Sequence, residues 1–590
     1  MDLNQKLSSL QEISKTLLSK IFSSVPGTKH IVIEPSVIRP LERVCSVSWL
    51  KGNGIEKIFK LEGNCPNFGN SPVFYMIFCK LATFKRVVDQ IRSQIDQENP
   101  VKNRFHIIIV PRYLNYFQDE LEALGLFSII KLHCFHWFPI HLDAGILSLE
   151  LHDVYKNLYL LHDYTFLQPL SKALWNMFFV IGKPKFQIAV GEYSNKILRQ
   201  IDLLSSEKGE TDRLNSDIGA LIIIDRNVDY PSALLTPGTY SALLNEVYGV
   251  TTGTVEHKED EEETAQGRLN PVIKKQPVKF TLDSNLDSIY FEIKNLYFTE
   301  VTSSLRTMTR KLKSEALESR DMGLNEMRHY VQKLLQPAQT RKKLIANHLL
   351  AAETIANVLG PRYESQREIE SNIIQNTNRA SNFSYLEESL CTEDDPCVTL
   401  RLFCLLCVTQ KLTESEIKNF WRKFLHQFGF CSSLAYRYLI NANFVPEVGV
   451  PGQTKIRFPK FTTKEFYANA NKFKQIPANP ELANLGNPGC ASYVFGGIYI
   501  PLLTKIASMI VSATPIDEIK SKLEGLGMVT LRNDNAYPLE TRTVLIYFIG
   551  GVTYAEIAAC NLLEAFTRAT IIVMSDKIVS GNDLMKQMLS

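Results

Sequence analysis

The chain has 590 residues, of which 45% are hydrophobic and 22% are charged, and its formal net charge is +3. This composition is typical of a globular protein and excludes wholesale disorder. The small net charge gives no support to a dedicated nucleic-acid surface or a polybasic membrane patch. A chain of this length can bury several cores, so we expect more than one domain.

The amino terminus carries charge early and lacks the apolar core of a signal peptide, so we expect a cytoplasmic protein. A membrane span would need about 20 consecutive apolar residues, and the candidate runs are interrupted by Arg401, Lys505 and Glu556. The 11 cysteines are an odd number, which is typical of free thiols and not of a disulfide framework. Any association with a membrane is therefore expected to be peripheral.

The first 140 residues alternate short apolar segments with patterns of helical period. Apolar residues from Leu3 to Ile21 recur at helical spacing, and a further helix is expected over 113–124. Buried strands joined by helical crossovers predict a doubly wound, mostly parallel α/β domain. The expected strands are 30–33, 57–61, 73–79, 105–110 and 129–132.

A second α/β pattern covers residues 141–250 and then stops abruptly. The α/β character returns over 476–590, where too few strands follow to make a stable sheet alone. We therefore expect 141–250 and 476–590 to form one domain that is split in sequence. Its expected elements are strands at 146–150, 220–224, 543–549 and 570–574 and helices at 167–181 and 554–568.

The intervening residues 251–475 predict a helical third domain. Its first part, 251–276, is polar and contains a run of acidic residues, so we expect a mobile acidic loop. Farther on, two helical patterns separated by a polar break at 320–323 predict a helical hairpin near 305–335. The apolar, Met-bearing stripe of this hairpin could receive an amphipathic helix of a partner, or it could pack the core of its own domain.

Two carboxylates and a guanidinium follow the apolar run 221–224. Asp225, Arg226 and Asp229 would lie at the carboxyl end of a buried strand, where ligands bind in open α/β sheets. Such a pair of carboxylates could serve a nucleotide- or metal-dependent enzyme. The alternative is structural, with Arg226 tying loops together and the two Asp acting as its partners or as helix caps. No Walker lysine or Gly-rich phosphate loop accompanies the motif, which favours the structural interpretation.

The glycine pair Gly550 and Gly551 follows the expected strand 543–549 and precedes a helix. Free N–H groups at a helix start can bind phosphate, but this spacing is not that of a dinucleotide-binding loop. Thr553 and Glu556 have the spacing of a capping box, in which each side chain satisfies a backbone N–H of the other residue. The pattern therefore favours a structural turn.

Other chemistry-bearing residues form no convincing site. Cys404 and Cys407 lie in an apolar run and are expected to be core thiols. The histidines at 133, 136 and 141 lack the spacing of a metal-binding set. A Gly-x-Ser-x-Gly nucleophile elbow is also absent. We therefore expect no catalytic residue, no metal and no cofactor.

Three motifs in chain order resemble the signature of the SM family, the Sec/Munc-type regulators of SNARE-mediated membrane fusion. The first is the strand followed by Asp225-Arg226-x-x-Asp229 and by Thr239-Tyr240. The second and third are 493–501 and 548–559, the latter with the family's Gly-Gly-x-Thr-x-x-Glu-Ile pattern. The segments 33–51 and 320–328 resemble the class C vacuolar-sorting branch of the family and lean to its animal B-type paralogue.

The resemblance implies an arch of three domains without enzymatic activity. It implies that SNARE helices, syntaxin-type and assembled bundles, bind in a cleft between domain 1 and the helical domain. The expected SNARE-binding residues are Arg320, Met322, Leu324, Met327 and Tyr330. The vacuolar branch further implies docking on an α-solenoid subunit, of the Vps-sixteen or VIPAR type, of a tethering complex at late endosomes and lysosomes.

Overall fold

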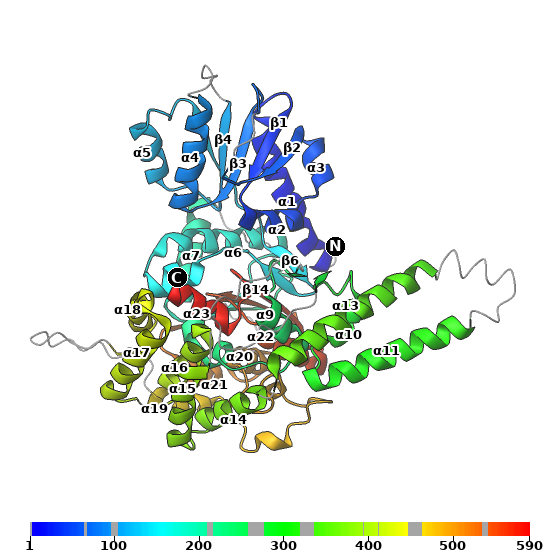
Figure 1. The fold of residues 1–590 in the computed structure, drawn as a ribbon, viewed down its shortest axis with the longest axis vertical. Helices are drawn as coiled ribbons and strands as arrows, with labels where there is room; N and C mark the ends of the chain where they lie inside the picture. Colours follow the sequence, from blue (N-terminus) through cyan, green and yellow to red (C-terminus); the bar gives the residue numbers. More distant parts are fainter. Residues whose placement is uncertain are drawn as a thin grey trace, which may run out of the picture.

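The computed structural model describes residues 3–63, 68–95, 104–208, 216–257, 277–318, 335–360, 362–392, 395–410, 412–446, 463–533 and 541–590. An upper α/β body, which we call domain 1, sits on a larger body from which two long helices project to one side (Figure 1). We call the sheet of the larger body and its covering helices domain 2, and the remaining helical part domain 3.

Domain 1 is built on a five-stranded parallel sheet with the order β2-β1-β3-β4-β5. The central strands are buried along their whole length, which explains their uninterrupted apolar sequences. The strands are β1 (Lys29–Ile33), β2 (Ile55–Lys60), β3 (Val73–Phe78), β4 (Phe105–Val110) and β5 (Ile130–Cys134), and the helices are α1 (Leu3–Ser23), α2 (Pro35–Val44), α3 (Val47–Gly52), α4 (Leu81–Ile95) and α5 (Asn115–Ala123).

Domain 2 contains a seven-stranded sheet with the order β12-β8-β9-β13-β14-β7-β6. Its edge strands β12 and β6 are antiparallel to their neighbours, and the other pairs are parallel. The strands are β6 (Ile140–Asp143), β7 (Ile146–Ser148), β8 (Phe186–Val190), β9 (Ala220–Asp225), β12 (Val529–Asn533), β13 (Thr543–Ile549) and β14 (Thr570–Ser575). The central pair β9 and β13 joins Leu221 to Leu545, so the sheet is split in sequence.

The helices around this sheet are α6 (Leu167–Ile181), α7 (Glu192–Lys208), α8 (Pro231–Leu234), α9 (Tyr240–Tyr248), α20 (Leu502–Val511), α21 (Ile516–Leu523), α22 (Tyr554–Thr567) and α23 (Gly581–Leu589). Short 3-10 or π helices are η1 (Lys156–Leu160), η2 (Tyr164–Phe166), η3 (Arg226–Val228), η4 (Phe430–Ser432), η5 (Pro480–Leu482), η6 (Ala491–Phe495) and η7 (Glu524–Leu526).

Domain 3 consists mainly of helices. They are α10 (Ser288–Ile293), α11 (Phe298–Glu318), α13 (Leu335–Leu359), α14 (Arg362–Ile374), α15 (Arg379–Thr392), α16 (Pro396–Thr409), α17 (Glu414–Phe428), α18 (Ser433–Asn441) and α19 (Thr463–Lys472). Helices α11 and α13 are the two that project from the body (Figure 1). In the described ranges no helix has the length and apolar character that a membrane span requires.

Two apolar cores hold these parts together. The larger core runs from α1 through domain 2 into the helices of domain 3. A smaller core fills the space between the domain 1 sheet and helices α4 and α5. Neighbouring residues of a strand point to opposite faces, so Ile31 of β1 belongs to the larger core and Val32 to the smaller one.

The expected fold class is confirmed: a doubly wound α/β domain, a parallel-sheet domain split in sequence, and a helical excursion. The domain boundaries at residues 140, 250 and 475 stay predictions. One detail was wrong, because the expected loop 251–276 begins with strand β10 (Thr254–His257), which pairs antiparallel with β11 (Val278–Thr281). Residues 258–276 lie outside the described ranges.

Candidate functional site

Arg226 lies at the centre of a buried cluster in which the sequence motifs meet. Its side chain is 0% exposed, and its guanidinium donates two hydrogen bonds, of 2.9 and 3.0 Å, to the carboxylate of Glu556. The guanidinium also donates to the carbonyl oxygen of Asp229 and lies 4.5 Å from the ring centroid of Phe548. Burial lowers the pKa of Arg226, but Glu556, Asp229 and Tyr159 together outweigh burial, so the pKa is raised. Arg226 therefore stays protonated and joins segments 330 positions apart.

The two Asp residues of the motif act as helix caps. Asp225 accepts hydrogen bonds from the backbone N–H groups of Tyr193 (2.8 Å) and Ser194 (2.7 Å) in the first turn of α7. Asp229 accepts from the N–H of Leu502 (2.8 Å), the first residue of α20, and from the hydroxyl of Tyr499 (2.9 Å). The carboxylate partner of Arg226 is Glu556, so of the two roles expected for the Asp side chains the contacts favour capping.

The glycine pair forms a turn whose donors are already used. Gly550 and Gly551 donate their N–H groups to one carboxylate oxygen of Asp576, at 2.7 and 3.1 Å. Both glycines have positive φ, +93° and +97°, which other residues rarely adopt. The capping box predicted from the spacing of Thr553 and Glu556 is present at the start of α22. Because Asp576 occupies the N–H groups, this turn offers no phosphate site.

Thr239 and Tyr240 connect domain 2 to the base of the projecting helices. Thr239 is fully buried at the start of α9, and its neighbour Tyr240 makes a hydrogen bond of 2.9 Å to Nδ1 of His348 on α13. The other ring nitrogen of His348 lies 3.0 Å from Asp287, the N-cap of α10. Neither His348 nor Asp287 was predicted from the sequence, although an Asp before a helical run is a known capping signal.

The charged side chains of the buried cluster are shielded from solvent, which suits them to bracing the scaffold. Asp225, Arg226 and Glu556 are 0% exposed and Asp229 is 2% exposed. Burial raises the pKa of Asp225 and of Asp576 to about 7. Within the described ranges, no group of three or more His, Cys, Asp or Glu could hold a metal ion.

The expected SNARE-binding residues Arg320, Met322, Leu324, Met327 and Tyr330 lie outside the described residues. The arms that lead to them are described, and there Leu305 and Met308 of α11 are 1% and 4% exposed. This half of the apolar stripe therefore packs the core of domain 3, which was one of the two alternatives.

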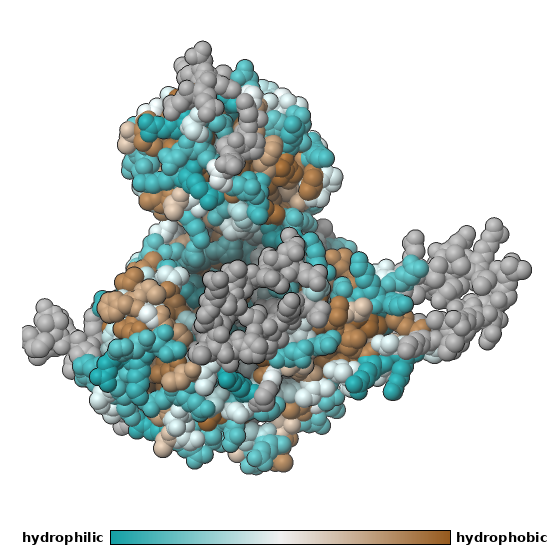
Figure 2. Space-filling view, viewed as in Figure 1, coloured by the Kyte–Doolittle hydropathy of each residue, from teal (hydrophilic) through white to brown (hydrophobic). Residues whose placement is uncertain are grey.

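A different set of apolar side chains is exposed at the base of the arms. Leu286, Phe291 and Leu349, which we call the hairpin patch, are 69%, 62% and 48% exposed. Two contacts join α10 to α13: the Asp287–His348 contact and the 3.5 Å Glu292–Arg341 ion pair. Each residue of the hairpin patch lies within one helical turn of one of these contacts. Figure 2 shows hydrophobic surface gathered in this region with hydrophilic surface on either side. Among the side chains that the structure describes on the arms, exposed basic residues include Arg306, Arg310, Lys311, Lys342 and Lys343.

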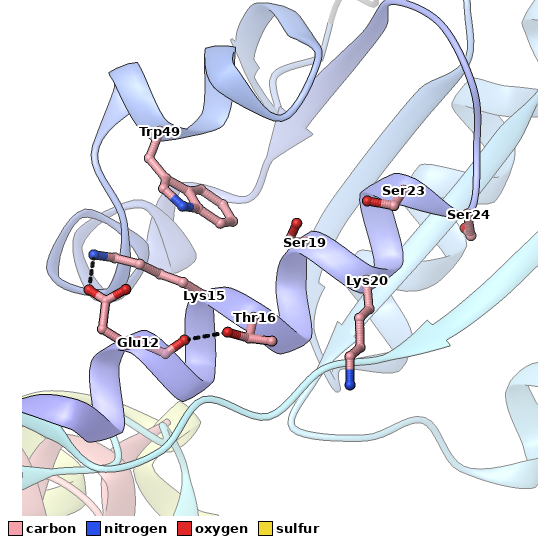
Figure 3. A pocket seen from close by; sticks show the side chains of 8 residues that line it. All are labelled: Glu12, Lys15, Thr16, Ser19, Lys20, Ser23, Ser24 and Trp49. Carbon is pink, nitrogen blue, oxygen red and sulfur yellow. Dashed lines mark hydrogen bonds and ion pairs between the residues drawn. The ribbon is translucent and has the colours of Figure 1, made fainter.

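A polar groove of about 540 Å³ lies between α1 and α3, near the half-buried ring of Trp49 (Figure 3). Its hydroxyls are mostly used within the protein: Thr16 donates to a backbone carbonyl at 2.9 Å and Ser19 donates to Asn53 at 2.7 Å. Lys15 is paired with Glu12 at 2.7 Å. These contacts leave little for a ligand to replace.

Known proteins are similar to this chain over nearly its whole length. A family model described as the Sec1 family matches residues 29–587. The chain is 23% identical to vacuolar protein sorting-associated protein 33B of Homo sapiens, covering 98% of this chain and 97% of that protein. It is 24% identical to vacuolar protein sorting-associated protein 33A of Rattus norvegicus, covering 99% and 98%.

Two solved structures share the fold. One is the SM protein Vps45 in complex with the Qa SNARE Tlg2, with a TM-score of 0.60 and 13% identity over 98% of this chain and 97% of that chain. The other is the Unc18–syntaxin 1 complex from Monosiga brevicollis, with a TM-score of 0.58 and 12% identity over 98% and 99%.

Proposed function

The chain belongs to the Sec1 family, as its three motifs predicted, and from this premise we propose that it regulates SNARE assembly during membrane fusion. The vacuolar protein sorting relatives support a role in endosomal and lysosomal transport. The observation that carries the proposal is the family match over residues 29–587, together with a fold shared with an SM protein bound to a Qa SNARE.

We further propose that SNARE helices bind in a cleft between domain 1 and domain 3, against the α11–α13 arms. The exposed side chains of Phe291 and Leu349 offer apolar anchors of the kind that an amphipathic helix covers. The basic residues of the arms suit a helix whose polar face is acidic. Holding helices in register lowers the entropic barrier to their pairing without any bond chemistry.

The buried cluster supports this role mechanically. Tyr240 and Asp287 hold His348 and so fix α13 against domain 2. Arg226, which directly follows β9, is paired with Glu556 of α22 and so joins the sheet to this helix. A template for helix assembly needs such rigid placement, because helices bound in a flexible groove would still lose conformational entropy when they pair.

Docking on an α-solenoid subunit of a tethering complex is the second part of the proposal. Phe430 and Leu434 are 79% and 66% exposed and lie four residues apart on η4 and α18. A stripe with this spacing can be covered by a partner helix, and Figure 2 shows hydrophobic surface near α18. We expect Leu434→Asp to lose the tethering subunit in co-purification while SNARE binding is retained, and loss of both would contradict separate surfaces.

Fluorescence anisotropy with a labelled syntaxin-type SNARE helix tests the cleft. Leu349→Asp places a carboxylate in the hairpin patch and should weaken binding at least tenfold. Leu203→Asp is the matched control, since Leu203 is 62% exposed on α7 of domain 2. Equal affinity of the two variants for the helix would contradict the placement of the helix on the arms.

The enzyme alternative gains no support from the contacts of Asp225, Arg226 and Asp229. Each of these side chains is buried and hydrogen-bonded inside the protein. Asp229 lines a cavity, but its volume of about 30 Å³ is too small for a nucleotide, and the carboxylate already accepts from Tyr499 and Leu502. Equilibrium dialysis with nucleotide and Mg²⁺ checks this point. Saturable binding that is abolished by Asp225→Ala in a folded protein would favour the enzyme.

A further inference from the structure

A cavity of about 140 Å³ lies where domain 1 meets domain 2, beyond the carboxyl end of β4. Domain 1 contributes Pro111 and Arg112 to its lining, and the first two turns of α6 in domain 2 contribute Pro169 and Lys172. In doubly wound sheets, ligands bind outside the carboxyl ends of the strands. The cavity therefore lies at the edge of the domain 1 sheet where ligands bind in such folds, beyond the ends of β4 and β5.

Arg112 is a donor without an acceptor in this cavity. It makes no hydrogen bond or ion pair with any residue in the described part of the chain, and its Nε is buried without a partner. Buried polar groups are nearly always satisfied, because leaving one unpaired costs about 1 to 3 kcal/mol. The Nε of the half-buried Arg112 therefore lacks an acceptor that the described part of the chain does not supply.

The surroundings of Arg112 favour an anion. None of the residues that line the cavity is acidic, and Lys172 adds a second cation. Burial, and then the charge of Lys172, lowers the pKa of the lining residue His136 to about 4, so its ring is neutral at pH 7. The positive end of the α6 dipole lies on the same wall.

Apart from Gln168 and Cys134, the remaining lining residues are apolar and limit the size of a ligand. Trp137, Leu149 and Pro169 line the cavity, and the indole N–H of Trp137 is already donated to the carbonyl of Leu149 at 2.6 Å. The ring therefore offers apolar surface to the cavity. An apolar cavity of about 150 Å³ is known to hold benzene.

We propose that this cavity binds a small organic anion, in which a phosphate or carboxylate is attached to an apolar body of about benzene size. Arg112 holds the anionic group, since its planar fork matches both oxyanions. The apolar body packs against Trp137 and Pro169. Because Arg112 belongs to domain 1 and Lys172 to domain 2, the bound anion ties the two domains together.

Isothermal titration calorimetry on the full chain tests the site, with phenyl phosphate and benzoate as probes. We expect saturable binding of at least one probe, and an affinity at least tenfold lower in Arg112→Gln. The matched control is Arg92→Gln on the exposed face of α4, which should bind like the wild-type protein. Absence of saturable binding to the wild-type protein, or equal binding by Arg112→Gln, would overturn the proposal.

A second variant tests the apolar walls of the cavity and leaves the charge of Arg112 unchanged. Ala173→Leu fills the cavity beside Lys172 and should also weaken binding at least tenfold, with the melting temperature recorded to show that the variant is folded. Inorganic phosphate should bind more weakly than phenyl phosphate. Equal affinity for these two ligands would overturn the role of the apolar walls.

Discussion

Replacing Arg226 by Met tests whether the buried cluster braces the scaffold. Met fills similar apolar space but leaves the Glu556 carboxylate, which is 0% exposed, without its countercharge. Removing one partner of a buried ion pair costs about 3 to 5 kcal/mol, and the lost contact with Phe548 adds about 1 kcal/mol. At about 2 to 4 °C per kcal/mol for a domain of this size, the melting temperature should fall by roughly 10 °C or more.

Thermal unfolding followed by tryptophan fluorescence measures this loss. Arg532→Met is the matched control, because Arg532 makes a similar two-bond contact, at 2.8 and 2.7 Å, with the half-exposed Asp202. Exposed pairs contribute about 1 kcal/mol or less. Adding Glu556→Gln to Arg226→Met removes the unpaired charge and should restore at least half of the loss. A melting temperature within 2 °C of wild type for Arg226→Met, or no recovery in the double variant, would refute the reasoning.

Three further predictions concern the same cluster. Burial raises the pKa of Asp576 to about 7 from its ordinary 3.8, so the protonated side chain stabilises the fold fully below pH 4 and this stabilisation is lost as the pH rises to 7. The melting temperature of the wild-type protein should therefore fall relative to that of Asp576→Asn between pH 4.5 and 8. Parallel curves of melting temperature against pH for the two proteins would contradict this. Thr553→Ala removes the capping box and should cost about 1 kcal/mol in thermal unfolding, so an unchanged melting temperature would argue against the cap. Gly551→Ala should destabilise the protein far more than Gly249→Ala. Both glycines have positive φ, but only at Gly551 would a Cβ clash, lying 2.7 Å from Val579. Equal melting temperatures of the two variants would contradict the clash.

The sequence predicted most of the central strands, because buried parallel strands have uninterrupted apolar runs. Strands β3, β4, β9 and β13 have this character, and each was expected within one or two residues. Strand β12 was missed: it is an antiparallel edge strand, and its sequence Val-Thr-Leu-Arg-Asn mixes polar and apolar residues. Strand β10 was missed because its partner β11 follows only after the acidic run.

The buried cluster could be predicted residue by residue but not as an assembly. The spacing of Thr553 and Glu556 predicted their capping box, since that contact is local in sequence. The contact between Arg226 and Glu556 depends on how the split sheet closes, and a single sequence carries no signal for a contact between residues so far apart. No sequence pattern near His348 or Arg112 marks either residue. They stand out only in the structure, His348 by its hydrogen bond to Tyr240 and Arg112 by its buried, unpaired Nε.

Site-specific photo-crosslinking tests the proposed grip on SNARE helices most directly. A photoreactive amino acid placed at position 349 of α13, with position 203 of α7 as the control, is illuminated in the presence of a purified syntaxin-type SNARE helix. We expect a crosslinked product from position 349 and none from position 203. Crosslinking from position 203 but not from 349, or from neither while the helix binds, would contradict a template built on the α11–α13 arms.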